Sequence, residues 1–112
     1  ECIVETKRDL EDSSLVATIV GHVGDGNFHM LMLVDPNQPE ESAEAARINE
    51  RLVQRALAMD GTITGEHGVG MGKKKYMQSE HGVEALAVMR SIKRALDPQN
   101  LMNPGKMLPE EQ

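Results

Sequence analysis

The fold of this chain follows from the segment Gly21-His22-Val23-Gly24-Asp25-Gly26-Asn27-Phe28-His29. Asp25 and Gly26 predict a type I′ turn, because that turn needs positive φ at both central residues, which aspartate tolerates and glycine adopts freely. Runs rich in β-forming residues flank the turn at positions 15–21 and 28–34. The sequence therefore predicts an antiparallel hairpin.

The predicted register makes the two histidines of this stretch neighbours across the strands. His22 lies opposite His29, and their Cβ atoms are expected roughly 5 Å apart. Two imidazoles this close can share a cation, although a hydrogen-bonded histidine pair without a metal is an equal alternative for these two residues alone. Asp25 is interpreted as turn chemistry, and Asn27 as a residue that tolerates a left-handed backbone.

Both faces of the predicted hairpin are apolar, so each face requires a cover. One face carries Val20, His22, His29, Leu31 and Leu33, and the other carries Ile19, Val23, Phe28, Met30 and Met32. A helical pattern begins at Glu40 and is stopped by Gly61, and a second helix is expected from about Ser79 to Asp97-Pro98. The expected apolar stripes of these helices are Ile48, Leu52, Ala56 and Met59, and Leu86, Met89, Ile92 and Leu96. The fold class predicted is α+β, with a small antiparallel sheet that begins with the histidine-bearing hairpin and packs against two or three helices.

The composition limits the classes of function. The chain has 112 residues, so it is one domain at most. A formal net charge of −6 disfavours nucleic acid as a partner, and no apolar run is long enough to span a membrane. The chain opens without Met in what reads as the middle of a helix, with Ile3 and Leu10 on a shared stripe. We therefore expect a piece of a longer polypeptide, whose exposed domain interface favours self-association as a homo-oligomer.

A second group of polar residues lies between the two predicted helices. Residues 61–72 contain five glycines, and Glu66 and His67 stand next to each other among them. Glu66 added to His22 and His29 makes a set of two histidines and one carboxylate with open positions, which suits a substrate-binding cation such as Zn, Mn or Fe. His67 is then the natural proton acceptor, because imidazole titrates near neutral pH.

Phosphate binding and a solvated lysine face are two other interpretations of this region. Gly68-Val69-Gly70-Met71-Gly72-Lys73 lacks the spacing and the Ser or Thr of a phosphate-binding loop, so phosphate binding is set aside. The lysines at 73–75 are expected to form a solvated face, although Lys73 is close enough in sequence to Glu66 to contact an anionic ligand.

Four motifs in order carry a resemblance to a known family. They are Gly21-His22-x-Gly24-Asp25-Gly26-Asn27-x-His29, Gly61-Thr62-x-x-Gly65-Glu66-His67-Gly68-x-Gly70-x-x-Lys73, Asp97-Pro98 and Asn103-Pro104-Gly105-Lys106. Together they resemble the C-terminal domain of FAD-linked oxidases, and within it the cytochrome-type D-lactate dehydrogenase and glycolate oxidase branch. The resemblance implies a flavoprotein that oxidises a D-2-hydroxy acid to the 2-oxo acid and passes electrons to a quinone, a cytochrome or an electron-transfer protein.

The resemblance also assigns roles to residues of this chain. It places the metal ligands on His22, His29 and Glu66, and the base on His67. It places Asn103 and Gly105 near the flavin. Lys73 is the candidate substrate contact because it is close to Glu66 in the sequence. Leu31 stands where the hydroxyglutarate branch has a substrate-facing Asn, which favours a short, less polar substrate.

The resemblance further implies that residues 1–112 are an incomplete substrate domain without the N-terminal FAD-binding domain, so that the fragment alone is inactive. The expected location is cytoplasmic, peripheral to the inner membrane, or mitochondrial in a eukaryote. The alternative function is a non-catalytic metal-binding or protein-interaction module, and a cupin-like or hydrolytic metalloenzyme is a weaker third.

Overall fold

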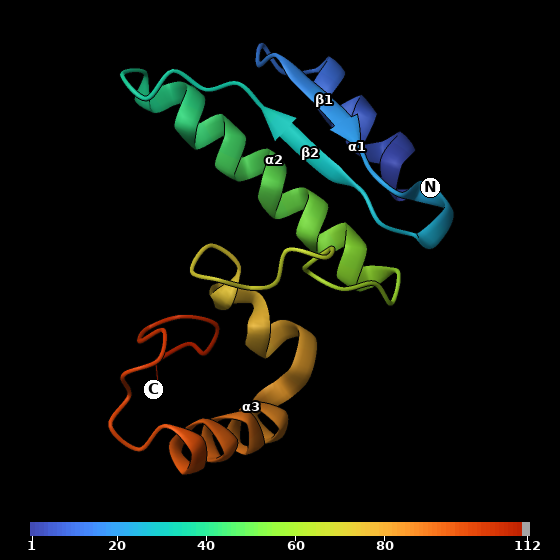
Figure 1. Ribbon diagram of the computed structural model, residues 1–112. Coiled ribbons are helices and arrows are strands. Elements are labelled where there is room, and N and C mark those ends of the chain that lie inside the picture. Colours follow the sequence, from blue (N-terminus) through green and yellow to red (C-terminus); the bar gives the residue numbers. More distant parts are fainter. Residues whose placement is uncertain (111–112) are drawn as a thin grey trace. The chain divides into compact units, whose positions relative to one another are not determined.

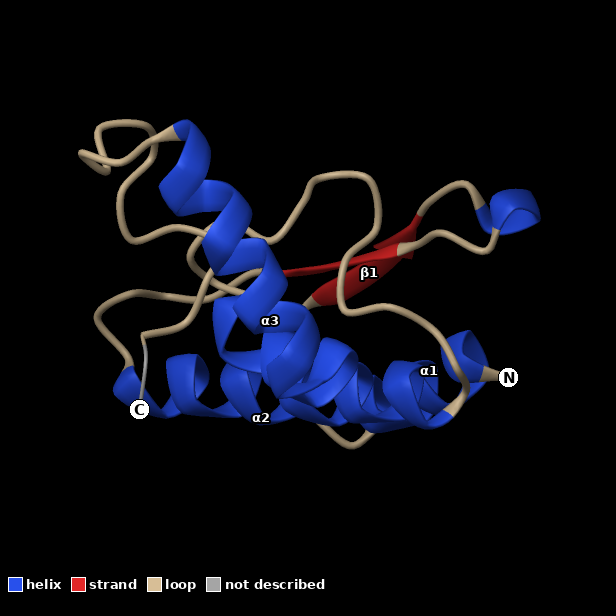
Figure 2. Ribbon diagram, turned by 90° about the horizontal axis from the view of Figure 1, so that it is seen from below, coloured by secondary structure: helices blue, strands red, loops and turns tan. Residues whose placement is uncertain are grey.

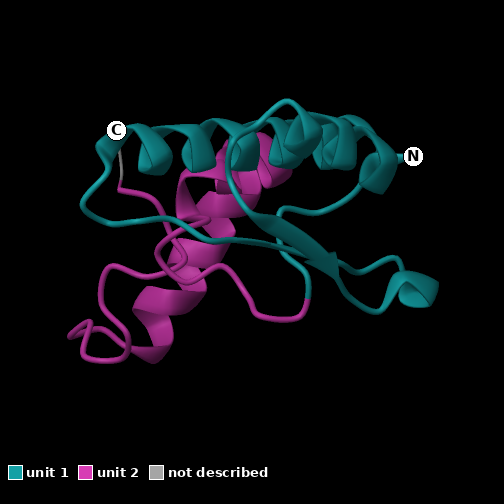
Figure 3. Cartoon of the chain, turned by 90° about the horizontal axis from the view of Figure 1, so that it is seen from above, with its two compact units in different colours: residues 1–65 teal, residues 66–112 magenta. Residues whose placement is uncertain are grey.

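The computed structural model describes residues 1–110, which belong to two compact units that divide after Gly65 (Figure 3). The described residues combine three α-helices with a two-stranded antiparallel sheet. The predicted α+β class is therefore confirmed.

The first unit is a layer of two helices against a layer of two strands (Figure 1). Its elements are α1 (Cys2–Glu11), β1 (Ala17–Val20), a 3-10 turn (Val23–Asp25), β2 (His29–Met32) and α2 (Pro39–Ala58). α1 contacts both α2 and β1, and the two helices lie on the same side of the strands (Figure 2). The other side of the sheet carries no helix of this unit.

Burial in the first unit follows this one-sided cover. Ile48 and Val53 of α2 are 0% and 2% exposed, and burying each such side chain stabilises the fold by about 1.5–3 kcal/mol. On the opposite face of the sheet, Val20 and Leu31 are about half exposed, at 46% and 56%. The expectation that both faces of the hairpin are covered is therefore wrong for this face. Met59, expected in the apolar stripe of the helix that begins at Glu40, is also exposed.

The register of the hairpin differs from the prediction by two residues. Val20, and not His22, lies opposite His29, so the predicted cross-strand histidine pair is wrong. A type I′ turn needs two consecutive residues with positive φ. Here Gly26 has φ 72°, whereas Asp25 belongs to the 3-10 turn. A shift of two residues keeps every side chain on its predicted face, since side chains alternate with period two.

A polar cluster joins α1 to α2. The Thr6 hydroxyl, which is fully buried, donates to the Cys2 carbonyl (2.8 Å) and accepts from Arg55 Nη1 (3.0 Å). Arg55 Nη2 and Arg51 Nε lie 2.7 and 3.2 Å from the two carboxylate oxygens of Asp9. Burial raises the pKa of Asp9, but hydrogen bonds and charges from the two arginines outweigh it, so the pKa of Asp9 is lowered.

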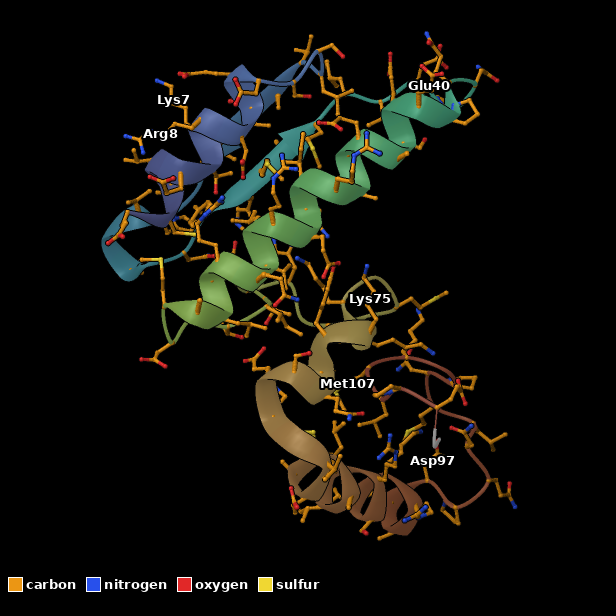
Figure 4. All side chains as sticks on the ribbon, turned by 180° about the vertical axis from the view of Figure 1, so that it is seen from behind. Lys7, Arg8, Glu40, Lys75, Asp97 and Met107 are labelled. Carbon is orange, nitrogen blue, oxygen red and sulfur yellow. The ribbon has the colours of Figure 1, made fainter. Side chains whose placement is uncertain are left out.

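The ends of α2 follow its sequence signals. Pro39 begins the helix, and Glu40 lies in its first turn, where a negative charge meets the positive end of the helix dipole (Figure 4). At the other end, Gly61 N–H donates to the Ala56 carbonyl (2.8 Å) and Asp60 N–H to the Leu57 carbonyl (3.1 Å). This pattern is a Schellman motif with Asp60 in the left-handed region, at φ 57°. The predicted stop at Gly61 is confirmed.

The second unit is built around one kinked helix. A 3-10 turn (Lys74–Tyr76) leads into α3 (Met77–Leu96), and Gly82 breaks the helical backbone with φ 78° and ψ 169°. Tyr76, Met77 and Leu86 are buried. Ile92 and Leu96, predicted to be buried with Leu86, are 56% and 74% exposed, because no described element of this unit covers their side of α3.

Asp97 closes α3 and the loop that follows. Its buried carboxylate accepts hydrogen bonds from Lys93 Nζ, Leu101 N–H and Met102 N–H. The Lys93 hydrogen bond and the two backbone N–H groups lower the pKa of Asp97 from 3.8 to about 2. The predicted helix end at Asp97-Pro98 is confirmed. In the described part of the chain no helix is both long and apolar enough to span a bilayer.

Candidate metal and substrate site

His22 lies in the loop between the strands, where its backbone organises the turn. Its carbonyl accepts the N–H of Asp25 (2.9 Å) and of Asn27 (3.3 Å). Gly21 and Phe28 lie close together at the two ends of this loop, so that a Cβ atom at position 21 would collide with the Cα of Phe28. His22 itself is exposed, so a solute can reach its side chain.

His29 begins β2 and lies against the last residue of the first unit. A Cβ atom added at Gly65 would collide with the amide oxygen of Asn27 and would lie 3.3 Å from His29 Cε1. Position 65 therefore requires glycine for lack of space. Glu66 follows by one peptide bond, which places its Cα about 3.8 Å from that of Gly65.

Asn27 has a different role from the predicted one. The residues with positive φ in the described chain do not include Asn27, so tolerance of a left-handed backbone does not explain it. Its Oδ1 atom is buried and has no hydrogen-bond partner among the described residues. The only sign of this in the sequence is that Asn27 stands two residues before the candidate ligand His29.

Glu66 and His67 begin the second unit and approach each other. Glu66 Oε1 lies 3.5 Å from His67 Nε2, with side-chain exposures of 48% and 78%. Neighbouring side chains point apart in regular structure, and the irregular backbone around Gly68 and Gly70, with φ 78° and 54°, provides the exception. A carboxylate and an imidazole are thus side by side and open to solvent.

Lys73 and Lys74 follow the glycine-rich segment, and both are half-buried. Burial lowers the pKa of Lys73, and the charge of Lys75 lowers it further. Lys74 Nζ donates to the Gly105 carbonyl at 3.0 Å. Two of the three lysines are therefore not the solvated face that was expected.

The C-terminal segment with the assigned flavin residues folds back within the second unit. Asn103 and Gly105 have φ 49° and 74°, so their backbone makes tight turns. Met107 N–H, in the part of the segment labelled in Figure 4, donates to the Gly70 carbonyl at 2.7 Å. This contact and the Lys74 bond hold the segment against the glycine-rich one, a connection that the sequence analysis did not foresee.

The residues of the site fit a divalent cation by their chemistry. Imidazole nitrogen and carboxylate oxygen are the donors that Zn, Mn and Fe accept. Two observations of the structure agree with a site here. Position 65 has no room for a Cβ atom beside His29. The buried Asn27 Oδ1 has no hydrogen-bond partner among the described residues, which is rare for a buried polar atom.

Comparison with known proteins gives a consistent family. The model of the C-terminal domain of FAD-linked oxidases matches residues 1–107. The chain is 52% identical over 109 residues to a mitochondrial D-lactate dehydrogenase [cytochrome] of Arabidopsis thaliana, covering 97% of this chain and 19% of the relative. It is 54% identical over 108 residues to a probable mitochondrial D-lactate dehydrogenase of Danio rerio, with coverages of 96% and 22%.

A bacterial relative agrees with these two. The chain is 38% identical over 90 residues to the glycolate oxidase subunit GlcD of Escherichia coli K12, covering 80% of this chain and 18% of the relative. The chain thus spans about a fifth of the length of the curated relatives that it matches. The family model covers nearly the whole chain, and the predicted resemblance is confirmed: this chain belongs to the family of C-terminal domains of FAD-linked oxidases.

Proposed function

We propose that this chain is the part of a flavin-dependent dehydrogenase that binds a short D-2-hydroxy acid, of the D-lactate or glycolate type, for oxidation to the 2-oxo acid. The observation that carries the proposal is the identity of 52% and 54% to relatives named D-lactate dehydrogenase. Leu31 supports a short substrate. It lies two residues after His29 on the same strand face and is 56% exposed, and its apolar side chain offers no partner to a second substrate carboxylate.

We propose His22, His29 and Glu66 as the residues that hold a divalent cation, Zn, Mn or Fe. Three protein ligands leave open positions for a substrate. A bound cation supplies charge that lowers the pKa of an alcohol or of water. The packing of Gly65 against His29 supports this assignment, because it fixes the backbone one residue before Glu66.

The remaining assignments concern the proton, the carboxylate and the cofactor. His67 Nε2 takes the proton of the substrate hydroxyl, and its 78% exposure leaves the ring accessible. Lys73 pairs with the substrate carboxylate, and Asn103 and Gly105 lie near the flavin. A bound FAD would supply the hydride-accepting chemistry, and the proposed onward electron acceptor is a quinone, a cytochrome or an electron-transfer protein.

The test uses the complete flavoenzyme and separates proton transfer from metal binding. His67→Asn is expected to lower kcat for D-lactate by about 10²-fold or more without loss of bound metal. Glu66→Ala is expected to lose the metal. His81→Asn, a histidine outside these assignments, is the matched control and should change neither. A His67→Asn enzyme with kcat within twofold of wild type would remove the proposed base.

The isolated 112 residues provide a second test. We expect them neither to retain FAD nor to oxidise D-lactate, because they span only about a fifth of the length of the curated relatives. Flavin absorbance in the purified fragment would contradict this expectation. The compartment printed in the names of the two D-lactate dehydrogenases favours a mitochondrial location over a cytoplasmic one, which subcellular fractionation tests.

A protein-interaction module is the second candidate, and α3 is the observation that favours it. Val88, Ile92 and Leu96 lie on one side of this helix and are 60%, 56% and 74% exposed. Sedimentation of the chain over a range of concentrations tests the predicted self-association. A monomer at all concentrations counts against it.

A further inference from the structure

Asn27 is the residue of the site that neither the backbone nor the proposed chemistry explains. Its φ is not in the left-handed region, so the turn does not require an asparagine. Its amide oxygen is buried and has no partner among the described residues. An unpaired buried acceptor destabilises a fold, because the atom has lost its hydrogen bonds to water and gained none in return. A buried acceptor of this kind therefore calls for a donor.

The surroundings of this oxygen contain a candidate donor. Asn27 Oδ1 and His29 Cε1 both border the position above Gly65 where a Cβ atom would stand. Cε1 is bonded to both ring nitrogens of the imidazole, so a nitrogen of His29 is one bond away from an atom in this contact. All three residues belong to the first unit.

We propose that Asn27 is a positioning residue for His29 in the metal-bound state. Its amide oxygen accepts the N–H of the His29 ring when the other ring nitrogen binds the divalent cation. A histidine that binds a metal nearly always donates its second ring N–H to an acceptor, which fixes the tautomer and the orientation of the ring. The inference rests on the proposed metal site, and it adds a residue that the ligand set does not contain.

The packing around Gly65 holds the Asn27 amide beside the His29 ring. The Asn27 amide occupies the space that a side chain at position 65 would need, and His29 Cε1 borders the same space. The Asn27 side chain is therefore confined next to His29. The hydrogen bond is then formed without a large rearrangement. This hydrogen bond would satisfy the buried Asn27 Oδ1, which has no partner among the described residues.

The consequence is an opposite effect of one substitution on two measurements. Asn27→Leu removes the unpaired acceptor, so the metal-free chain is expected to have an unchanged or higher urea midpoint. The same substitution removes the acceptor for His29, so the Kd for Zn²⁺ is expected to rise by about tenfold or more. A purely structural role for Asn27 predicts the reverse for stability, namely a lower urea midpoint.

The experiment titrates the 112-residue chain with Zn²⁺ by calorimetry and follows the imidazole N–H protons by NMR. In wild type, a slowly exchanging ring proton of His29 should appear on addition of Zn²⁺. It should also appear in Asn27→Asp, which keeps an oxygen acceptor of the same shape, and be absent in Asn27→Leu. Asn37→Leu, the same change in a remote loop, is the matched control and should leave the Kd unchanged.

The outcomes separate this inference from the function on which it rests. Wild-type chain that binds no Zn²⁺ overturns the metal site and, with it, the role of Asn27. Wild-type chain that binds Zn²⁺, with Asn27→Leu binding equally well or with no protected ring proton of His29, leaves the metal site standing and overturns this inference alone. Weaker binding that is accompanied by a lower urea midpoint of the metal-free variant overturns it as well.

Discussion

Gly65→Ala is the substitution whose effect follows most directly from the packing of the site. The new Cβ would collide with the Asn27 amide oxygen and lie 3.3 Å from His29 Cε1. Gly65 is not among the residues with positive φ, so the cost is steric and does not come from the backbone. Overpacking of this kind costs about 1–3 kcal/mol, and alanine returns about 0.4–1 kcal/mol by restricting the unfolded chain. The expected net loss is about 1–2 kcal/mol.

The assay is urea unfolding of the 112-residue chain followed by circular dichroism at 222 nm. Gly72→Ala is the matched control, because nothing lies within 4 Å of its Cβ position and its φ is not positive; it should stabilise the chain by about 0.4–1 kcal/mol. In the double variant Asn27→Ala and Gly65→Ala, the obstacle is gone and most of the loss should be recovered. Gly65→Ala with the same free energy of unfolding as Gly72→Ala would refute this reasoning.

Three further predictions concern the C-terminal ends of α2 and α3 and the polar cluster that joins α1 to α2. Asp60→Gly should raise the free energy of unfolding by about 0.5–1 kcal/mol in urea titrations, because it relieves a left-handed aspartate at φ 57°. The depressed pKa of Asp97 means that its stabilising effect is present above pH 4 and lost as the pH falls toward 2; NMR exchange should show the Leu101 amide losing protection in that window, and constant protection would contradict it. Asp9→Asn should destabilise the chain by about 1–2 kcal/mol through loss of its ion pair with Arg55, and an unchanged urea midpoint would contradict it.

The sequence predicted those parts of the fold that depend on neighbours along the chain. The beginning of α2, predicted at Glu40 and found at Pro39, and its stop at Gly61 both depend on helix-end chemistry that the sequence shows. The faces of the two strands were also readable, since alternation survives a shift of two residues. The register could not be predicted from the sequence. The His22 carbonyl accepts hydrogen bonds from the N–H groups of Asp25 and Asn27, and this arrangement competes with the turn expected at Asp25.

Other parts of the molecule depend on contacts that no local pattern contains. Helical spacing correctly placed Ile92 and Leu96 on one side of α3, but spacing says nothing about whether another element covers that side. The bond from Lys74 to Gly105 joins residues 31 positions apart. The packing of the Asn27 amide beside Gly65 and His29 joins residues that are far apart in the sequence. Residue types therefore indicated the candidate site, and packing added the residues around it.

X-ray absorption at the Zn edge of the Zn²⁺-loaded flavoenzyme tests the proposed ligand set, by comparison of wild type with the His22→Ala, His29→Ala and Glu66→Ala variants. The proposed site predicts two imidazole nitrogens and a carboxylate oxygen at roughly 2.0–2.2 Å in wild type, with one imidazole missing in each histidine variant and the carboxylate missing in Glu66→Ala. A spectrum that is the same in all four proteins would contradict the claim that these three side chains hold the cation.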